Sequence, residues 1–184
     1  ALQEWSTVYG RKVFAAAGNG TLFTLEGSRE DLEKMSKEDG QALADKLHWQ
    51  DRYHGTTNYL YWKLRCDVEQ KQEMIDARRS FFDGKKAFKE EGDLEQAGKL
   101  LEEGTRLLQN VVDTVGRDSE GNSILFMNDE GITEEAIKAL LILERVRDGL
   151  PKGDFPLKEL WVNPNFVGKR SELRDKFIRW AGEN

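Results

Sequence analysis

The chain has 184 residues, with 34 acidic against 28 basic side chains and a formal net charge of −6. An acidic balance argues against binding to nucleic-acid phosphates, which needs a basic face. The single cysteine, Cys66, excludes an intrachain disulfide and a cysteine-based metal cluster. No apolar run approaches the roughly 18 residues that a membrane-spanning helix needs. Length and composition therefore predict a single helical domain over residues 1–184.

Two interpretations of residues 13–25 stay open. Two apolar runs, 13–17 and 21–25, flank Gly18-Asn19-Gly20, a pattern typical of a β-hairpin with a glycine-rich turn. The first run could equally be a helix that ends at Gly18, and the repeat comparison below favours this helix.

The next two segments also read as helical. Ser28, with acids at Asp31 and Glu33, predicts a helix start and a helix over 29–53, weakened by Gly40. Residues 57–91 contain no proline and predict one long helix, or two helices with a break between them.

The segment 93–115 gives the clearest helical pattern. Apolar residues recur at steps of three and four, which keeps one face of a helix apolar. Asp93 is a suitable N-cap, since its carboxylate can accept a bond from an unpaired backbone N–H. Gly92 before it can end the preceding helix in the left-handed conformation.

The last third predicts two further helices and a connector. Thr133 is expected to cap a helix that continues to about Arg147. Residues 149–164 hold all three prolines of the chain and predict an irregular connector, held onto the core by Leu157, Leu160 and Trp161. A C-terminal helix over 171–184 is expected to start at Ser171.

Spacing within the chain indicates a repeat. The sequence from Gly84 to Asp93 places glycine, phenylalanine, glycine and an Asp or Asn at the same offsets as the sequence from Gly10 to Asn19. An aromatic ring on one helix can pack against a small alanine on the next across a glycine corner. On this pattern, residues 77–115 resemble a tetratricopeptide repeat. Its aromatic, turn, small and large positions would be Phe88, Gly92, Ala97, Leu101 and Gly104.

A fainter resemblance rests on two short motifs, Asn-Tyr-x-Tyr-Trp-Lys at 58–63 and Gly-Asp-Leu-Glu-x-Ala at 92–97. Both resemble stretches of uncharacterised planctomycete-type bacterial proteins that are anchored in the membrane near their N-terminus. The resemblance implies a membrane tether outside this fragment, which begins without methionine. The compartment itself stays open.

Aromatic residues crowd into fourteen positions and leave two interpretations. They are core residues, or they form a surface that binds a protein or peptide partner, since such surfaces are rich in Tyr and Trp. The residues are Trp49, Tyr53, Tyr59, Tyr61 and Trp62.

Catalytic chemistry finds little support in the sequence. His48, Asp51 and His54 lie three residues apart on a predicted helix, whereas zinc pairs on helices use a spacing of four and need a third ligand. The simpler interpretation is that these three are ordinary polar residues near a helix end. We therefore assign no catalytic residue, no metal and no cofactor.

The sequence as a whole predicts an all-α antiparallel array of five or six helices with a tetratricopeptide-like hairpin. The leading hypothesis for its function is a non-catalytic protein–protein interaction or scaffold domain. A metal-assisted enzyme using His48, Asp51 and His54 is the alternative. A third hypothesis is a structural role, in which the aromatic segment packs against other parts of the same chain.

Overall fold

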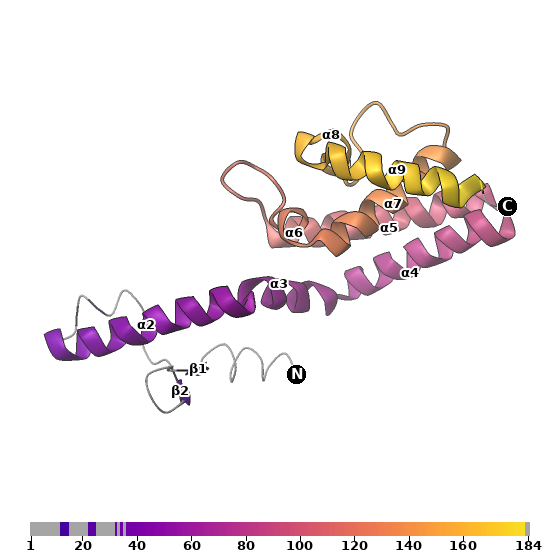
Figure 1. Cartoon of the computed structure of the whole chain (residues 1–184). Helices are drawn as coiled ribbons and strands as arrows, with labels where there is room; N and C mark the ends of the chain where they lie inside the picture. The colour runs from indigo at the N-terminus through magenta and orange to yellow at the C-terminus, as the bar shows by residue number, and fades with distance from the viewer. Residues whose placement is uncertain (1–11, 15–21, 25–31, 33, 35, 183–184) are drawn as a thin grey trace. The chain divides into compact units, whose positions relative to one another are not determined.

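The computed structural model describes residues 12–14, 22–24, 32, 34 and 36–182, and within them it is an all-α protein with one short β-hairpin (Figure 1). Its α-helices have the following bounds: α2 Lys37–Thr57, α3 Tyr59–Glu69, α4 Gln72–Lys86, α5 Leu94–Val115, α6 Ile124–Asn128, α7 Glu130–Val146, α8 Lys158–Val162 and α9 Val167–Gly182. The all-α prediction is confirmed, with eight α-helices in the described part against the five or six expected. The chain divides into two compact units, 1–67 and 68–184, where the sequence predicts one domain.

The first unit holds the β-hairpin. Strands β1 (Lys12–Phe14) and β2 (Leu22–Thr24) pair antiparallel, with Phe14 opposite Leu22. The favoured helix over this segment is therefore wrong, and the hairpin interpretation is confirmed. Paired apolar strands hydrogen-bond each other across a short connection, which outweighs the similarity of spacing to Gly84–Asp93.

Helix α2 begins later than the sequence predicts. It starts at Lys37, after Ser36, whose hydroxyl oxygen accepts a bond from the Asp39 backbone N–H at 3.2 Å. The expected start at Ser28 lies outside the described residues. Among the described side chains of α2, the apolar residues Leu43 and Leu47, one helical turn apart, are buried. Of the two interpretations of 57–91, one long helix is wrong and helices with a break between them are confirmed, because α3 ends at Glu69 and α4 starts at Gln72.

The second unit is built around an antiparallel hairpin of α4 and α5 (Figure 1). Asp93 caps α5, accepting a bond from the Gln96 backbone N–H at 2.9 Å. Gly92 has φ +67°, the left-handed conformation that glycine adopts without a Cβ clash. The predicted corner and the start of α5 are both confirmed.

Small residues bring the two hairpin helices close together. A Cβ added to Gly104 of α5 would lie 2.6 Å from Cδ1 of the Phe81 ring of α4. A Cβ added to Gly84 of α4 would lie 2.9 Å from Cγ of Leu101. Leu101 and Gly104 thus lie in the helix interface as predicted, with Phe81 as the ring that covers Gly104.

Phe88 lies in a π-helical turn, η3 (Ala87–Glu91), between α4 and the Gly92 corner. Its ring stacks on Trp180 of α9, with centroids 5.8 Å apart, and also contacts Phe177. Ala97, the predicted partner of Phe88, is fully buried in α5. The Phe88–Ala97 contact itself stays a prediction.

Helix α7 packs on α5, and its start differs from the expected one. Asp129 caps it, accepting a bond from the Ile132 backbone N–H at 3.0 Å, so the helix begins at Glu130. Thr133 is not the cap. It lies one turn inside the helix, where its buried hydroxyl donates to the carbonyl oxygens of Asp129 and Phe126.

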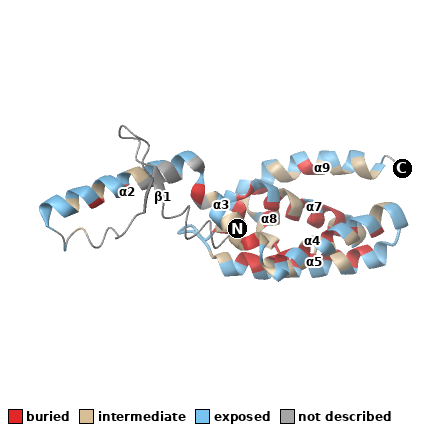
Figure 2. Cartoon of the chain, turned by 90° about the horizontal axis from the view of Figure 1, so that it is seen from below, coloured by how far each residue is buried: buried red, intermediate tan, exposed pale blue. Residues whose placement is uncertain are grey.

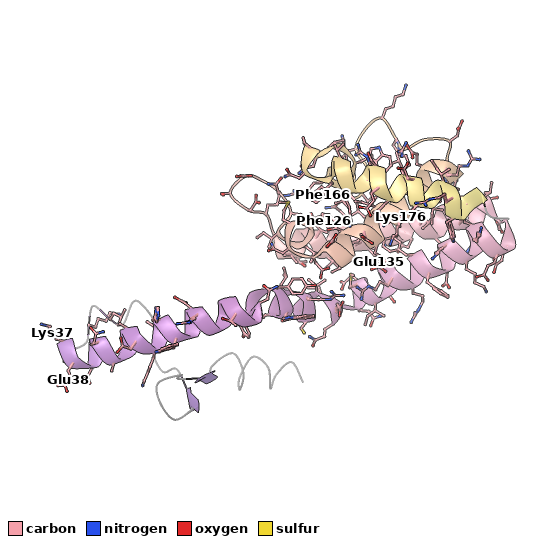
Figure 3. The ribbon with its side chains drawn as sticks, in the orientation of Figure 1. Lys37, Glu38, Phe126, Glu135, Phe166 and Lys176 are labelled. Carbon is pink, nitrogen blue, oxygen red and sulfur yellow. The ribbon has the colours of Figure 1, made fainter. Side chains whose placement is uncertain are left out.

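The connector contains more regular structure than predicted. Helix α8 and a 3-10 turn, η4 (Pro164–Phe166), lie within 149–164 and at its end. Leu157 and Leu160 are fully buried, as expected. Phe166 of η4 meets Phe126 of α6 edge to face, with ring centroids 6.5 Å apart (Figure 3).

The last helix, α9, starts at Val167 and packs on α7. The start expected at Ser171 is wrong, because the turn η4 leads directly into α9. Leu173 is the buried residue of this helix.

Buried residues of the second unit gather between α4, α5 and α7 (Figure 2). One partly buried ion pair crosses this interface, where Arg78 Nε of α4 donates to Oε2 of Glu135 of α7 at 3.0 Å; Glu135 is labelled in Figure 3. None of the helices in the described part of the chain combines the length and apolar character needed to span a bilayer.

Candidate functional site

The aromatic residues singled out by the sequence have mixed environments in α2 and α3. Tyr59 is buried, Trp49 and Tyr61 are half-buried, and Trp62 is 46% exposed. The Tyr61 and Trp62 rings meet edge to face at 5.0 Å. The side chain of Tyr53 lies outside the described part. Neither interpretation, core or partner surface, is decided by this pattern.

The histidine cluster is described only in part. His48 and Asp51 are exposed on α2, and the His48 ring contacts Trp49 at 5.8 Å. The side chain of His54 is not described. Among the side chains that are described, no three potential metal ligands converge. The metal-assisted alternative stays a prediction that the zinc or iron content of the purified protein would test.

The second unit contains a hollow of about 720 Å³ beside α5. Its walls are one face of α5, the end of α7 and the loop that follows α7. Leu143 forms an apolar part of the wall, and the loop adds further apolar side chains: Leu150, Pro151, Phe155 and Pro156. Such a volume falls within the usual range of ligand pockets.

A second hollow, of about 580 Å³, adjoins the first and shares its residues Asp154, Phe155 and Pro156. Together the two hollows follow one face of α5, through Glu102, Thr105, Arg106, Gln109 and Asp113. At 1.5 Å per residue, the distance from residue 102 to residue 113 along the helix is about 16 Å. We call this feature the α5 groove.

The loop that walls the α5 groove is attached to the helices at both ends. At its start, the Gly149 backbone N–H donates to the Glu144 carbonyl at 2.8 Å, and Gly149 has φ +125°. At its end, the Leu157 backbone N–H donates to Gln109 Oε1 of α5 at 2.8 Å. Because Leu157 is also fully buried, the outer wall of the groove is preformed.

Charged residues line the rim of the α5 groove, and many of them are paired. Arg147 Nε donates to Glu102 Oε1 at 2.8 Å, and the Arg147 guanidinium lies against Gly98, where a Cβ would come within 2.7 Å of Cζ. Arg106 forms two bonds with Glu103, which lower the pKa of the Glu103 carboxyl. The rim therefore offers both signs of charge around an apolar interior.

Sequence reasoning missed this groove. The sequence flagged 149–164 as a connector and 93–115 as a helix, but it contained no signal that the two would lie side by side. Proline and apolar residues in the connector, at Pro151, Phe155 and Pro156, were the available hint.

The fold and the groove define the class: an all-α protein with a groove along one helix of an antiparallel hairpin. No family model, curated protein sequence or solved structure matches the chain. Both family resemblances stay predictions.

Proposed function

We propose that the second unit is a protein–protein interaction module that holds a peptide segment of a partner protein in the α5 groove. The observation that carries this proposal is the continuity of two hollows, a mainly apolar one and a more polar one that share Phe155 and Pro156, along about 16 Å of α5. That length matches about five residues of extended chain, or about three turns of helix. Grooves of this kind bind peptides through a few apolar anchor residues.

The character of the rim supports a peptide rather than a polyanion. Arg147 is already paired with Glu102, and Arg117 is paired with Glu159 at 2.7 Å. A ligand of high charge would have to compete with these pairs. An apolar anchor flanked by ordinary polar residues fits without breaking them.

The resemblance of residues 77–115 to a tetratricopeptide hairpin points the same way, as an analogy. That family uses stacked hairpins to bind segments of partner proteins. Here the groove uses α5, the second helix of the hairpin, together with the loop after α7.

The experiment has two stages. A displayed library of random peptides is selected on the whole chain, and enriched peptides are measured by fluorescence anisotropy. Phe155→Ala removes an apolar wall shared by both hollows, and we expect it to weaken binding at least about tenfold. Phe82→Ala is the matched control, because Phe82 is 69% exposed on α4 and lines neither hollow.

A Trp62→Ala variant tests the aromatic segment in the same assay. Loss of binding on Trp62→Ala or Phe82→Ala, with Phe155→Ala unchanged, would place the site elsewhere and refute the groove. Failure to enrich any peptide would refute the proposed function itself.

A further inference from the structure

A third hollow, of about 220 Å³, lies between α4, α7 and α9 and differs from the α5 groove in its chemistry. Its apolar lining consists of Ile142, Leu173, Phe177 and Trp180. Its polar lining consists of three lysines, one from each helix: Lys85, Lys138 and Lys176, the last of which is labelled in Figure 3. Although the chain holds more acids than bases, no carboxylate is part of this lining.

The aromatic wall of this lysine-rimmed hollow is held in place from several sides. The Trp180 ring stacks on Phe88 at 5.8 Å and contacts Phe177 at the same distance. Lys85 Nζ and Lys89 Nζ lie 5.5 and 5.2 Å from its centroid, within cation–π range. Lys89 also donates to the Trp180 carbonyl oxygen at 2.6 Å. The hollow is therefore preformed.

The three lysines differ in how far they are neutralised. Lys138 pairs with Glu134 at 3.0 Å, and Lys176 pairs with Glu172 at 2.5 Å, each with an acid of its own helix. Among the described residues, Lys85 has no carboxylate within ion-pair distance and lies over the Trp180 ring instead. The ammonium group of Lys85 is thus not neutralised by a carboxylate of the described residues.

We propose that this hollow binds a small organic anion with an apolar body, such as a short-chain or aromatic carboxylate. The apolar body would lie on Ile142, Leu173 and the Trp180 ring, which gains from burial of its surface. The carboxylate would lie at the rim among the ammonium groups, where Lys85 supplies the uncompensated charge. This site is independent of the α5 groove.

Size and shape favour a small molecule over a macromolecule. The volume lies below the roughly 300–1,000 Å³ of common ligand pockets, so the body must be short. Ile142 and Leu173 are almost completely buried, at 5% and 1% exposed, and lie beneath the lysines. A membrane-binding surface would instead have protruding apolar side chains to insert.

The test uses the whole chain labelled with nitrogen-15 and three probes: octanoate, 1-octanol and acetate. Octanoate has both an apolar chain and a negative charge. 1-Octanol has the chain without the charge, and acetate has the charge without the chain. We expect saturable shifts of the amide signals around Lys138, Leu173 and Trp180 with octanoate, and affinities at least about fivefold weaker for 1-octanol and acetate.

The variant K85Q/K138Q removes two rim charges while keeping the side-chain stems. We expect it to weaken octanoate binding by about fivefold. The matched control is K99Q/K152Q, since Lys99 pairs with Glu95 on its own helix as Lys138 does with Glu134, and neither residue lines the hollow. Circular dichroism confirms that both variants remain folded.

Three results would overturn the proposal. Equal binding of 1-octanol and octanoate would show that the lysines do not select an anion. An equal loss in K99Q/K152Q would show that only net charge matters. Absence of saturable shifts with octanoate would show that the hollow binds no small organic anion of this kind.

Discussion

Replacing Gly104 with alanine tests the close contact that positions α5 on α4. The added Cβ would lie 2.6 Å from Phe81 Cδ1 and 3.2 Å from the Ala77 carbonyl oxygen. Ordinary carbon contacts are about 3.5–4.0 Å, so the Phe81 ring would have to shift by about 1 Å. Overpacking of this kind costs about 1–3 kcal/mol, and alanine regains about 1 kcal/mol of helix propensity. We expect a net loss of about 1 kcal/mol in unfolding free energy.

The assay is urea unfolding followed by circular dichroism. Gly168→Ala is the matched control, because Gly168 lies in α9 with no atom near the position of its Cβ. It should leave the stability unchanged or raise it by up to about 1 kcal/mol. Combining Gly104→Ala with Phe81→Leu should relieve part of the strain, giving a favourable coupling of about 1 kcal/mol in a double-mutant cycle. If Gly104→Ala stabilises the protein as much as Gly168→Ala, the close contact is not a constraint and the reasoning fails.

Two further predictions concern an ion-pair network and the hairpin corner. Hydrogen bonds from Lys169 and Lys138 lower the pKa of the Glu134 carboxyl to about 2 from an ordinary 4.5. The ionised carboxylate therefore stabilises the fold above about pH 4.5. This contribution to stability is lost as the pH falls toward 2. Because the side chain is 28% exposed, Glu134→Gln should cost only about 1 kcal/mol at pH 7, and the difference from the parent chain should vanish near pH 2 in unfolding curves. Gly92 has φ +67°, so Gly92→Ala should lower the free energy of unfolding by about 1–2 kcal/mol, and Gly92→Asn should lower it by less. Equal losses for the two variants in thermal unfolding would contradict the left-handed corner.

Local signals predicted α5 to within one residue because they agreed with one another. The apolar stripe, the N-cap at Asp93 and the left-handed Gly92 all point to the same boundary. At α7 two capping residues, Asp129 and Thr133, lie one turn apart, and only packing decides between them. The prediction named Thr133 alone, and the structure shows its hydroxyl bonded instead to the buried carbonyl oxygens of Phe126 and Asp129, one turn inside the helix.

A helix was favoured over the N-terminal β-hairpin because of a match in residue spacing. Gly10, Phe14 and Gly18 share their offsets with the segment from Gly84 to Gly92, but offsets alone do not carry the tertiary contacts that stabilise a helix. The two apolar runs on either side of Gly18-Asn19-Gly20 were the better signal, and the structure pairs Phe14 of the first with Leu22 of the second.

The α5 groove and the lysine-rimmed hollow both depend on residues far apart in sequence. The α5 groove joins Glu102 to Pro156, and the lysine-rimmed hollow joins Lys85 to Trp180. Periodicity reports which face of a helix is apolar, but not which later helix will cover it. Such sites become visible only when the packing order of the helices is known.

The bond between Lys89 and Trp180, 91 residues apart in the chain, has a consequence for how this protein is made. The α4–α5 hairpin joins neighbouring segments and can form while the ribosome is still adding residues, whereas Trp180 is synthesised only as part of α9. Until then the Phe88 ring lacks its aromatic neighbours and is available to chaperones. A nascent chain stalled after α7 would therefore contain a formed α4–α5 hairpin in which the Phe88 ring lacks its contacts with α9.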